Sequence, residues 1–320
     1  MTPGRLRRLT EELVDEHLGA IERSSAPEAL VDEIDYALRP PRHERRVPSY
    51  GAFVVPSTPI ADWSAGTGLD ISIVEVADRP DDELRRYADG LTSWAVRGPD
   101  GIDAYVVFDR AAGSERDLVV LAAATGAIVV QRHPNGEVRL VGSFGVARWD
   151  GVGWQVEAPV ASWLIDVCAH ALDEGVSEWL LWFAVHDLGA RRIGALIVAG
   201  ASDATNAIFE RRLPTPPPLS VTRPETLGPL RHVLAQLDGA VLFDRAGTVV
   251  DLGVRIVPSV RAEANVPAFG GTRHTTARRF SHDDPEAVVI AVSEAGPVTV
   301  FRAGEIAGRS AAEGPWDTPD

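Results

Sequence analysis

The residues of this sequence best suited to bind a phosphorylated ligand lie in three short groups, all after position 235. The first is Asp238-Gly239-Ala240, in which a glycine beside an acidic side chain lets a ligand approach the main chain closely. The second is the run 270–275, with sequence GGTRHT. It offers main-chain N–H groups together with hydroxyl, guanidinium and imidazole donors, a set that suits a polyphosphate. The third is Ser293-Glu294, a polar pair at the end of an apolar run, where α/β sheets present ligand-binding groups.

Each group also has an ordinary structural interpretation. Asp-Gly is a common turn pair, so Asp238-Gly239 could be a plain turn. The GGTRHT run could be a capped helix start with a surface arginine, and Ser293-Glu294 could open a hairpin turn. The order of the three groups along the chain is much more specific than any one of them.

That order resembles the diadenylate cyclase (DAC) domain, the nucleotide-binding domain of the DNA-integrity scanning protein and its relatives. Two further segments are similar to the same family, the apolar run 194–200 (GALIVAG) and the run 252–258 (LGVRIVP). The resemblance implies a DAC domain over residues 158–310, an α/β domain built as a mixed β-sheet flanked by helices.

Members of this family each hold one ATP, and two domains meet face to face. The resemblance therefore implies a diadenylate cyclase that condenses two ATP into cyclic di-AMP and two pyrophosphates across a homodimer or higher homo-oligomer. Because ATP brings several negative charges into an acidic protein, a divalent cation, Mg²⁺ or Mn²⁺, must offset part of them. Carboxylate oxygens are ligands for such hard cations, and the resemblance assigns the metal to Asp238 and Glu294.

The resemblance also assigns roles residue by residue. It gives catalytic roles to Asp238, Arg273 and His274, with Asp238 helping to activate the 3′-hydroxyl group of ATP. The residues that it assigns to ATP binding are Gly239, Ala240, Gly271, Thr272, Thr275, Ser293 and Glu294.

Two positions depart from the family pattern. Thr275 stands where the family usually has the second arginine of an Arg-His-Arg motif, and Ala295 stands where it often has a second glutamate. A lost charge-assisted contact of about 1.5–3 kcal/mol would lower activity by one to two orders of magnitude. Arg278 or Arg279, one helical turn further on, could replace the missing arginine. The alternative function is therefore a catalytically weak or inactive DAC-like module that senses a nucleotide without turnover.

The elements that must position these groups alternate between helix and strand. The pattern of apolar residues predicts helices over 163–172, 176–188 and 227–237. It predicts strands over 194–200, 240–244, 249–257, 287–292 and 298–302. The GGTRHT run is expected in a loop that leads to residues 277–280.

Residues 1–157 are expected to form a separate α/β (α+β) accessory domain. The spacing of leucines predicts helices over 5–23 and 27–38, and a further helix is expected over 81–91. Short apolar runs predict strands over 50–55, 70–76, 104–108 and 118–122, followed by hairpins 127–132/137–142 and 145–149/153–157 around Asn-Gly and Asp-Gly turns. By analogy with the accessory domains of the family, this half is predicted to sense an unknown small-molecule or protein signal.

Composition limits the remaining possibilities. The chain has 320 residues, a net charge of −15 and no lysine, so binding to DNA is not expected. It has no apolar run long enough to span a membrane, and its single cysteine, Cys168, lies in an apolar stretch and is expected to be a buried structural thiol. We therefore expect a cytoplasmic protein. The last residues, 311–320, are expected to form a flexible tail.

Overall fold

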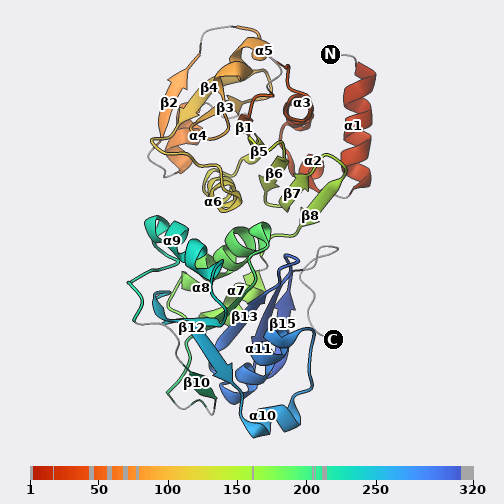
Figure 1. Cartoon of the computed structure of the whole chain (residues 1–320). Coiled ribbons are helices and arrows are strands. Elements are labelled where there is room, and N and C mark those ends of the chain that lie inside the picture. Colours follow the sequence, from red (N-terminus) through yellow and green to blue (C-terminus); the bar gives the residue numbers. More distant parts are fainter. Residues whose placement is uncertain are drawn as a thin grey trace. The chain divides into compact units, whose positions relative to one another are not determined.

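The computed structural model describes residues 3–16, 18–42, 47–55, 60–67, 71–76, 79–160, 162–203, 205, 207–210 and 215–310. Contacts within the chain divide it into two compact units, Met1–Pro159 and Val160–Asp320, shown in Figure 1. The expected tail, 311–320, lies outside the described residues.

The N-terminal unit is built on an eight-stranded sheet with the order β2-β4-β3-β1-β5-β6-β7-β8. Only β1 and β3 pair in parallel among the described strands of this sheet. The strands are β1 (Tyr50–Val54), β2 (Ser72–Glu75), β3 (Ser93–Arg97), β4 (Ile102–Val107), β5 (Ile128–Arg132), β6 (Val138–Gly142), β7 (Gly145–Trp149) and β8 (Trp154–Glu157).

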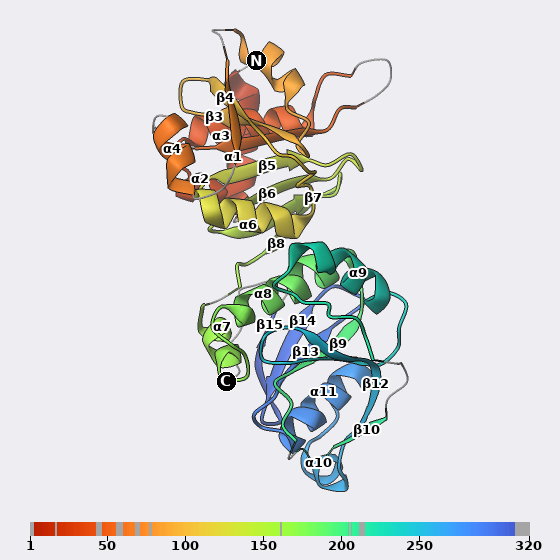
Figure 2. The same cartoon turned by 90° about the vertical axis from the view of Figure 1, so that its left-hand side faces the viewer.

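Helices cover both faces of this sheet. Successive side chains of a strand point to opposite faces, and the central strand β1 is apolar on both, so both faces are buried. In β1, Ala52 and Val54 pack with the helices α1 (Pro3–Asp15), α2 (Ala20–Arg23) and α3 (Pro27–Leu38). Phe53 packs on the other face, with α4 (Ile60–Thr67) and α6 (Glu115–Thr125). Figure 2 shows α6 lying across β5 and β6. The short helix α5 (Asp81–Leu84) leads into a 3₁₀ turn, 85–87.

Three expectations for this unit were wrong. The helix expected over 81–91 ends at residue 87, because the side chain of Asp89 accepts hydrogen bonds from the N–H groups of residues 91, 92 and 93 and forms a turn there. The run 118–122 is not a strand but part of α6, because the side chain of Ser114 and that of Asp117 form a reciprocal capping box that starts a helix there. The helix expected over 5–23 is two helices, since Gly19 between them adopts a left-handed conformation with φ of 66°. Strand β3 was not expected from the sequence.

The C-terminal unit contains a seven-stranded sheet with the order β10-β12-β11-β9-β13-β14-β15. Here β9 and β11 are parallel, and the other described pairs are antiparallel. The strands are β9 (Ala195–Ala199), β10 (Ile208–Glu210), β11 (Ala240–Phe243), β12 (Val249–Val257), β13 (Val288–Val292), β14 (Val298–Arg302) and β15 (Glu305–Arg309). The expected α/β class, and the mixed sheet expected for the C-terminal unit, are therefore confirmed.

The helices of this unit flank its sheet. They are α7 (Ser162–Ala169), α8 (Val176–Trp182), which continues as a π-helical turn over 183–188, α9 (Pro224–Leu234), α10 (Val260–Asn265) and α11 (Thr272–Asp283). Helix α11 packs on the sheet through Ala277 and Phe280, which join a buried cluster with Val198 and Val289. The GGTRHT run, expected in a loop, is thus mostly the first turn of this long helix.

Cys168 lies on α7 and is 1% exposed. Burial in apolar surroundings raises the pKa of its thiol to about 12, so the thiolate does not form at neutral pH. This agrees with a structural role. Of the helices in the described part of the chain, none is both long enough and apolar enough to cross a membrane.

Candidate functional site

A pocket of about 930 Å³ opens at one edge of the C-terminal sheet. Strand pairing explains why distant parts of the sequence meet there. Ala240 at the start of β11 lies beside Leu196 in β9, and Ala195 at the start of β9 lies opposite Val292 at the end of β13. Because β13 runs antiparallel to the other two, the residues before β9 and β11 and those after β13 share one edge.

The Asp238-Gly239 pair enters the pocket immediately before β11. Gly239 has φ of 107°, and a Cβ atom there would lie 2.7 Å from the carbonyl carbon of Gly253 in β12. Only glycine fits this close approach of two strands. The Asp238 side chain is exposed to the pocket and forms no hydrogen bond or ion pair with another described residue. Its carboxylate is therefore available to a ligand.

The N-terminus of α11 faces the same pocket. Gly271 is the N-cap residue, is exposed, and has no side chain with which to cap the helix. The first helical N–H groups have no partner within the helix, and the helix dipole places partial positive charge there. Gly271 and Thr272 both line the pocket, so this end of α11 is suited to an anion.

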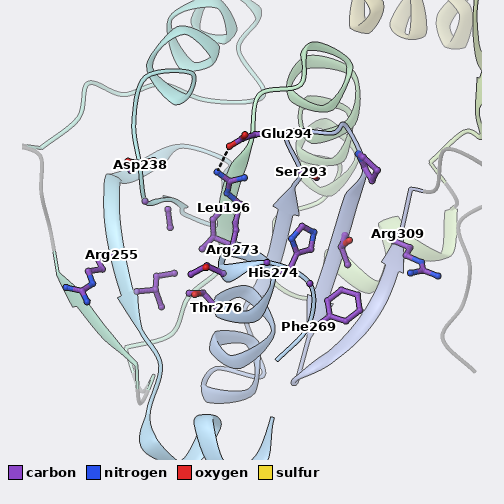
Figure 3. Close-up of a pocket in the computed structure, with 18 of the residues that line it drawn as sticks. Leu196, Asp238, Arg255, Phe269, Arg273, His274, Thr276, Ser293, Glu294 and Arg309 are labelled. Atoms are coloured by element: carbon purple, nitrogen blue, oxygen red, sulfur yellow. Dashed lines mark ion pairs between the residues drawn. The ribbon is translucent and has the colours of Figure 1, made fainter. Parts of the chain in front are cut away.

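Arg273 extends from this first turn toward the β13–β14 turn (Figure 3). Its Nη1 donates a hydrogen bond of 3.3 Å to the carbonyl oxygen of Val292, and its Nη2 lies 3.6 Å from Oε1 of Glu294. The arginine has room because position 194 is a glycine. A Cβ atom there would lie 2.4 Å from Nη1.

His274 lines the pocket beside two aromatic rings. Its ring centroid is 6.2 Å from that of Phe269 and 6.2 Å from that of Phe301. Burial lowers the pKa of His274 below its usual 6.5, and the positive charge of Arg273 lowers it further. The neutral imidazole is thus the favoured form at neutral pH.

Ser293 and Glu294 form the tight turn between β13 and β14. The N–H of Ser293 donates to the carbonyl oxygen of Pro297 at 2.9 Å, and the Ser293 hydroxyl accepts from the N–H of Ala295 at 3.1 Å. The Glu294 side chain is 79% exposed and points into the pocket region, where it faces Arg273. Ala295 itself does not line the pocket.

Thr275 is the one predicted site residue that does not line this pocket. Its hydroxyl bonds instead to the main chain of Phe269. Neither Arg278 nor Arg279 takes the place of a missing arginine. Arg278 donates to the carbonyl oxygen of Gly304, and Arg279 donates to that of Val266, outside the pocket.

The donor set of the pocket can be compared with what a divalent cation needs. Asp238 and Glu294 both line the pocket and supply carboxylate oxygens. Within the described parts of the chain, no third aspartate, glutamate, histidine or cysteine joins them to form a three-residue ligand group. Mg²⁺ is commonly bound by one or two carboxylates together with substrate phosphates. The residues therefore fit a cation that arrives with a phosphorylated ligand.

Sequence reasoning missed much of the pocket wall. The further lining residues are Leu196, Val254, Arg255, Ile256, Phe269, Gly270, Thr276, Pro297, Thr299, Arg309 and Ser310. Leu196, Val254 and Ile256 form an apolar part of the wall that suits a flat, weakly polar group such as a nucleobase. Val254 and Ile256 alternate along an expected strand, and this pattern could have predicted that both side chains face the same side. No pattern in the sequence indicated that Arg309 lines the pocket.

A sheet flanked by helices, with polar residues at one edge, a helix start suited to an anion and an apolar wall, is typical of a nucleotide-binding domain. Comparison with known proteins identifies which one. Residues 183–306 match the family described as DisA bacterial checkpoint controller nucleotide-binding, the DAC domain. Residues 7–157 match the family described as probable sensor domain DACNK. The C-terminal unit thus contains a DAC domain, as its sequence resemblance implied, and the N-terminal unit contains a DACNK domain.

No curated protein matches the chain. The solved structures that match it include the crystal structure of a hypothetical membrane spanning protein from Bacillus cereus, which is 26% identical. That match covers 41% of this chain and 62% of the other, with a TM-score of 0.32.

Proposed function

We propose that the DAC domain of this protein is a diadenylate cyclase that condenses two ATP molecules into cyclic di-AMP and two pyrophosphates. One observation carries the proposal. Asp238, the first turn of α11 and the Ser293-Glu294 turn come from three separate parts of the sequence and line one pocket. The match of residues 183–306 to the DAC family supports the same activity.

The proposed reaction is a phosphoryl transfer in each of two steps. The 3′-oxygen of one ATP loses its proton and attacks the α-phosphorus of the other, and the bond to pyrophosphate breaks. A second such step closes the ring. Because one domain holds one ATP, the proposal requires two domains to meet face to face in a homodimer or larger homo-oligomer.

Each residue has a part in this proposal. The carboxylate of Asp238 would help to remove the proton of the 3′-hydroxyl group, while Arg273 and the N–H groups that start α11 bind phosphate oxygens. His274, in its neutral form, can donate one hydrogen bond without adding positive charge. Asp238 and Glu294 would hold Mg²⁺ or Mn²⁺, which supplies charge neutralisation for the phosphates.

A second candidate is supported by position 275. Thr275 stands where the family motif usually has an arginine, so the pocket lacks that guanidinium group. The Thr275 hydroxyl bonds to the main chain of Phe269 and does not replace it. This favours a DAC domain that binds ATP or a dinucleotide with weak or no turnover. Calorimetry that finds tight nucleotide binding, together with no release of pyrophosphate, would support this candidate over the cyclase.

The rest of the proposal concerns location and regulation. We propose that the DACNK domain receives a small-molecule or protein signal, since its family is described as a probable sensor domain. A cytoplasmic location would give the enzyme access to ATP and keep Cys168 reduced.

The deciding assay incubates the full chain with ATP and either Mg²⁺ or Mn²⁺, with a sample in excess chelator, and separates the products by chromatography. We expect cyclic di-AMP and pyrophosphate in both metal samples and neither with chelator. Asp238→Asn should reduce the rate by at least about 100-fold. The matched control is Asp166→Asn, an exposed carboxylate of α7 outside the pocket, which should retain activity. No product above the Asp238→Asn background with either metal would reject the cyclase.

A further inference from the structure

Thr275, which departs from the family pattern, forms two hydrogen bonds to one main-chain residue. The same pair of bonds occurs at a second threonine in the described part of the C-terminal unit. The Thr275 hydroxyl accepts a hydrogen bond from the N–H of Phe269 and donates one to its carbonyl oxygen, both at 3.1 Å. In α9, the Thr226 hydroxyl accepts from the N–H of Ser220 at 3.0 Å and donates to its carbonyl oxygen at 2.6 Å. In both cases, a threonine in the first turn of a helix holds the main chain six residues earlier. We call this arrangement the helix-entry clasp.

The clasp at Thr275 fixes a residue of the pocket wall. Phe269 lines the pocket, and its ring is 5.9 Å from that of Phe301 and 6.2 Å from that of His274. The His274 ring in turn meets the Phe301 ring nearly at right angles, with an interplanar angle of 78°. Holding the main chain of Phe269 therefore also fixes one of the two rings against which His274 rests.

The segment between the clasped residue and the helix has little other support. It consists of Gly270, with φ of 58°, and Gly271, which has no side chain to cap α11. Glycine loses more conformational freedom on ordering than any other residue, so this pair gains most from an external restraint. The N–H of Thr275 also donates to the carbonyl oxygen of Gly271 at 3.0 Å, so one residue restrains both ends of the segment.

We infer that Thr275 is a positioning residue of the pocket, whose hydroxyl fixes Phe269 and thereby the His274 ring and the start of α11 before the ligand arrives. The inference rests on the proposed function for the identity of that ligand, ATP. An arginine side chain has five donors and no acceptor, so it could not accept the hydrogen bond from the N–H of Phe269. Where the family motif has a positively charged arginine, this chain has a threonine that holds the loop 269–271 in place.

The test compares Thr275→Val, which removes the hydroxyl group at nearly constant volume, with Thr275→Ser, which keeps it. Thr226→Val removes the other helix-entry clasp, away from the pocket, and is the matched control. Calorimetry measures the affinity for a non-hydrolysable ATP analogue with Mg²⁺. Nuclear magnetic resonance of the ligand-free full chain measures the ring signals of His274, which the rings of Phe269 and Phe301 shift. Thermal unfolding reports any general loss of stability.

We expect Thr275→Val to weaken binding of the analogue by about tenfold and to move the His274 signals, with Thr275→Ser close to the wild type on both measurements. Thr226→Val should lower the melting temperature and leave both measurements unchanged. If Thr275→Val does not fold, Phe269→Leu should still move the His274 signals and weaken binding, because it keeps the clasp and removes the ring.

Three results would overturn the inference. They are wild-type affinity and unchanged His274 signals in Thr275→Val, a Thr275→Ser variant as impaired as Thr275→Val, and tighter binding by Thr275→Arg. A wild-type chain that does not bind the analogue would reject the proposed function instead. The His274 signals would then still decide whether the clasp positions the ring.

Discussion

Nη2 of Arg273, in the first turn of α11, lies 3.6 Å from Oε1 of Glu294, in the turn between β13 and β14. The Arg273 side chain is 32% exposed and the Glu294 side chain is 79% exposed, so water screens this pair and its contribution to stability is small. A phosphate group can therefore displace Glu294 from Arg273 at little cost. The displaced carboxylate would then be free to take part in binding a divalent cation.

Replacing Arg273 should weaken nucleotide binding more than it weakens the fold. Arg273→Gln removes a charged, forked donor, and loss of one or two charge-assisted hydrogen bonds lowers affinity by roughly 10- to 100-fold. Calorimetry with a non-hydrolysable ATP analogue measures this directly. Arg261→Gln, which changes an exposed arginine of α10 outside the pocket, should bind the analogue like the wild type. Equal affinities for the two variants would contradict a phosphate-binding role.

The glycine at position 194 should matter for binding and little for stability. In Gly194→Ala, the new Cβ atom would lie 2.4 Å from Nη1 of Arg273 and 2.7 Å from Cγ of Glu294. Both neighbours belong to flexible side chains, so they can move aside, but Arg273 then loses its position against Val292. We expect the affinity for an ATP analogue to fall by about fivefold or more, with a melting temperature within about 2 °C of the wild type.

The control for this prediction is Gly66→Ala, at an exposed position of α4 outside the pocket. A Cβ atom there meets nothing within 4 Å, and alanine is favoured over glycine in a helix by up to about 1 kcal/mol. That variant should unfold at a slightly higher temperature and bind the analogue unchanged. If Gly194→Ala also bound the analogue unchanged, the close contact with Arg273 would have no functional consequence.

Much of the candidate site could be predicted because its residues carry their chemistry in local runs. Asp238-Gly239, Arg273-His274 and Ser293-Glu294 are each adjacent in sequence, and side-chain type alone points to phosphate and cation binding. Their meeting at one edge could not be derived locally. It depends on β13 running antiparallel to β9, a pairing in which Val292 lies opposite Ala195.

The missed features have physical reasons of the same kind. Position 275 was assigned to ATP binding, yet the structure commits its hydroxyl to Phe269, a contact six residues back that no period of helix or strand suggests. The run 118–122 is apolar enough for a strand. It is helical because the capping box of Ser114 and Asp117 starts a helix just before it. Strand β3, which begins at Ser93, is short and not strongly alternating, so only its pairing with neighbours defines it.

The buried ion pairs of the N-terminal unit give a prediction for stability. Glu33 is fully buried, with Oε2 3.0 Å from Nε of Arg85 and Oε1 3.2 Å from Nε of Arg97. It also accepts a hydrogen bond from the hydroxyl of Tyr50. Glu33→Gln removes one negative charge beside two buried guanidinium groups, which keep their pairs with Asp32 and Asp82 (Arg85) and with Asp81 (Arg97). Breaking a buried pair costs about 3–5 kcal/mol when the charge is left without a partner, so we expect a cost between that of a surface pair and this limit.

Amide hydrogen exchange of the full chain, read at α3 and β1, measures the free energy of unfolding of this unit. Glu11→Gln breaks the exposed pair with Arg7, 2.9 Å apart, and should cost less than about 1 kcal/mol. A cost for Glu33→Gln as small as that for Glu11→Gln would show that the buried network contributes no more than a surface pair.

His274 should make the stability of the DAC domain depend on pH below neutrality. Burial, followed by the charge of Arg273, lowers the pKa of His274 below 6.5, so the folded state disfavours the imidazolium form. As the pH falls through 6.5, the unfolded chain takes up a proton at this position before the folded chain does. The free energy of unfolding therefore declines from pH 6.5 down to the folded-state pKa and has no such decline above pH 7. His274→Gln should decline less steeply in that interval.

A titration of the His274 ring signals by nuclear magnetic resonance measures the cause of this decline. The folded chain should titrate below pH 6.5, and Arg273→Gln should raise the pKa of His274 part of the way back, because it removes one of the two causes and leaves burial unchanged. The Arg261→Gln variant should titrate like the wild type, since Arg261 is not among the groups that shift His274. A wild-type pKa at or above 6.5 would mean that His274 is protonated as readily as a free side chain. The neutral donor role assigned to it in the pocket would then be wrong.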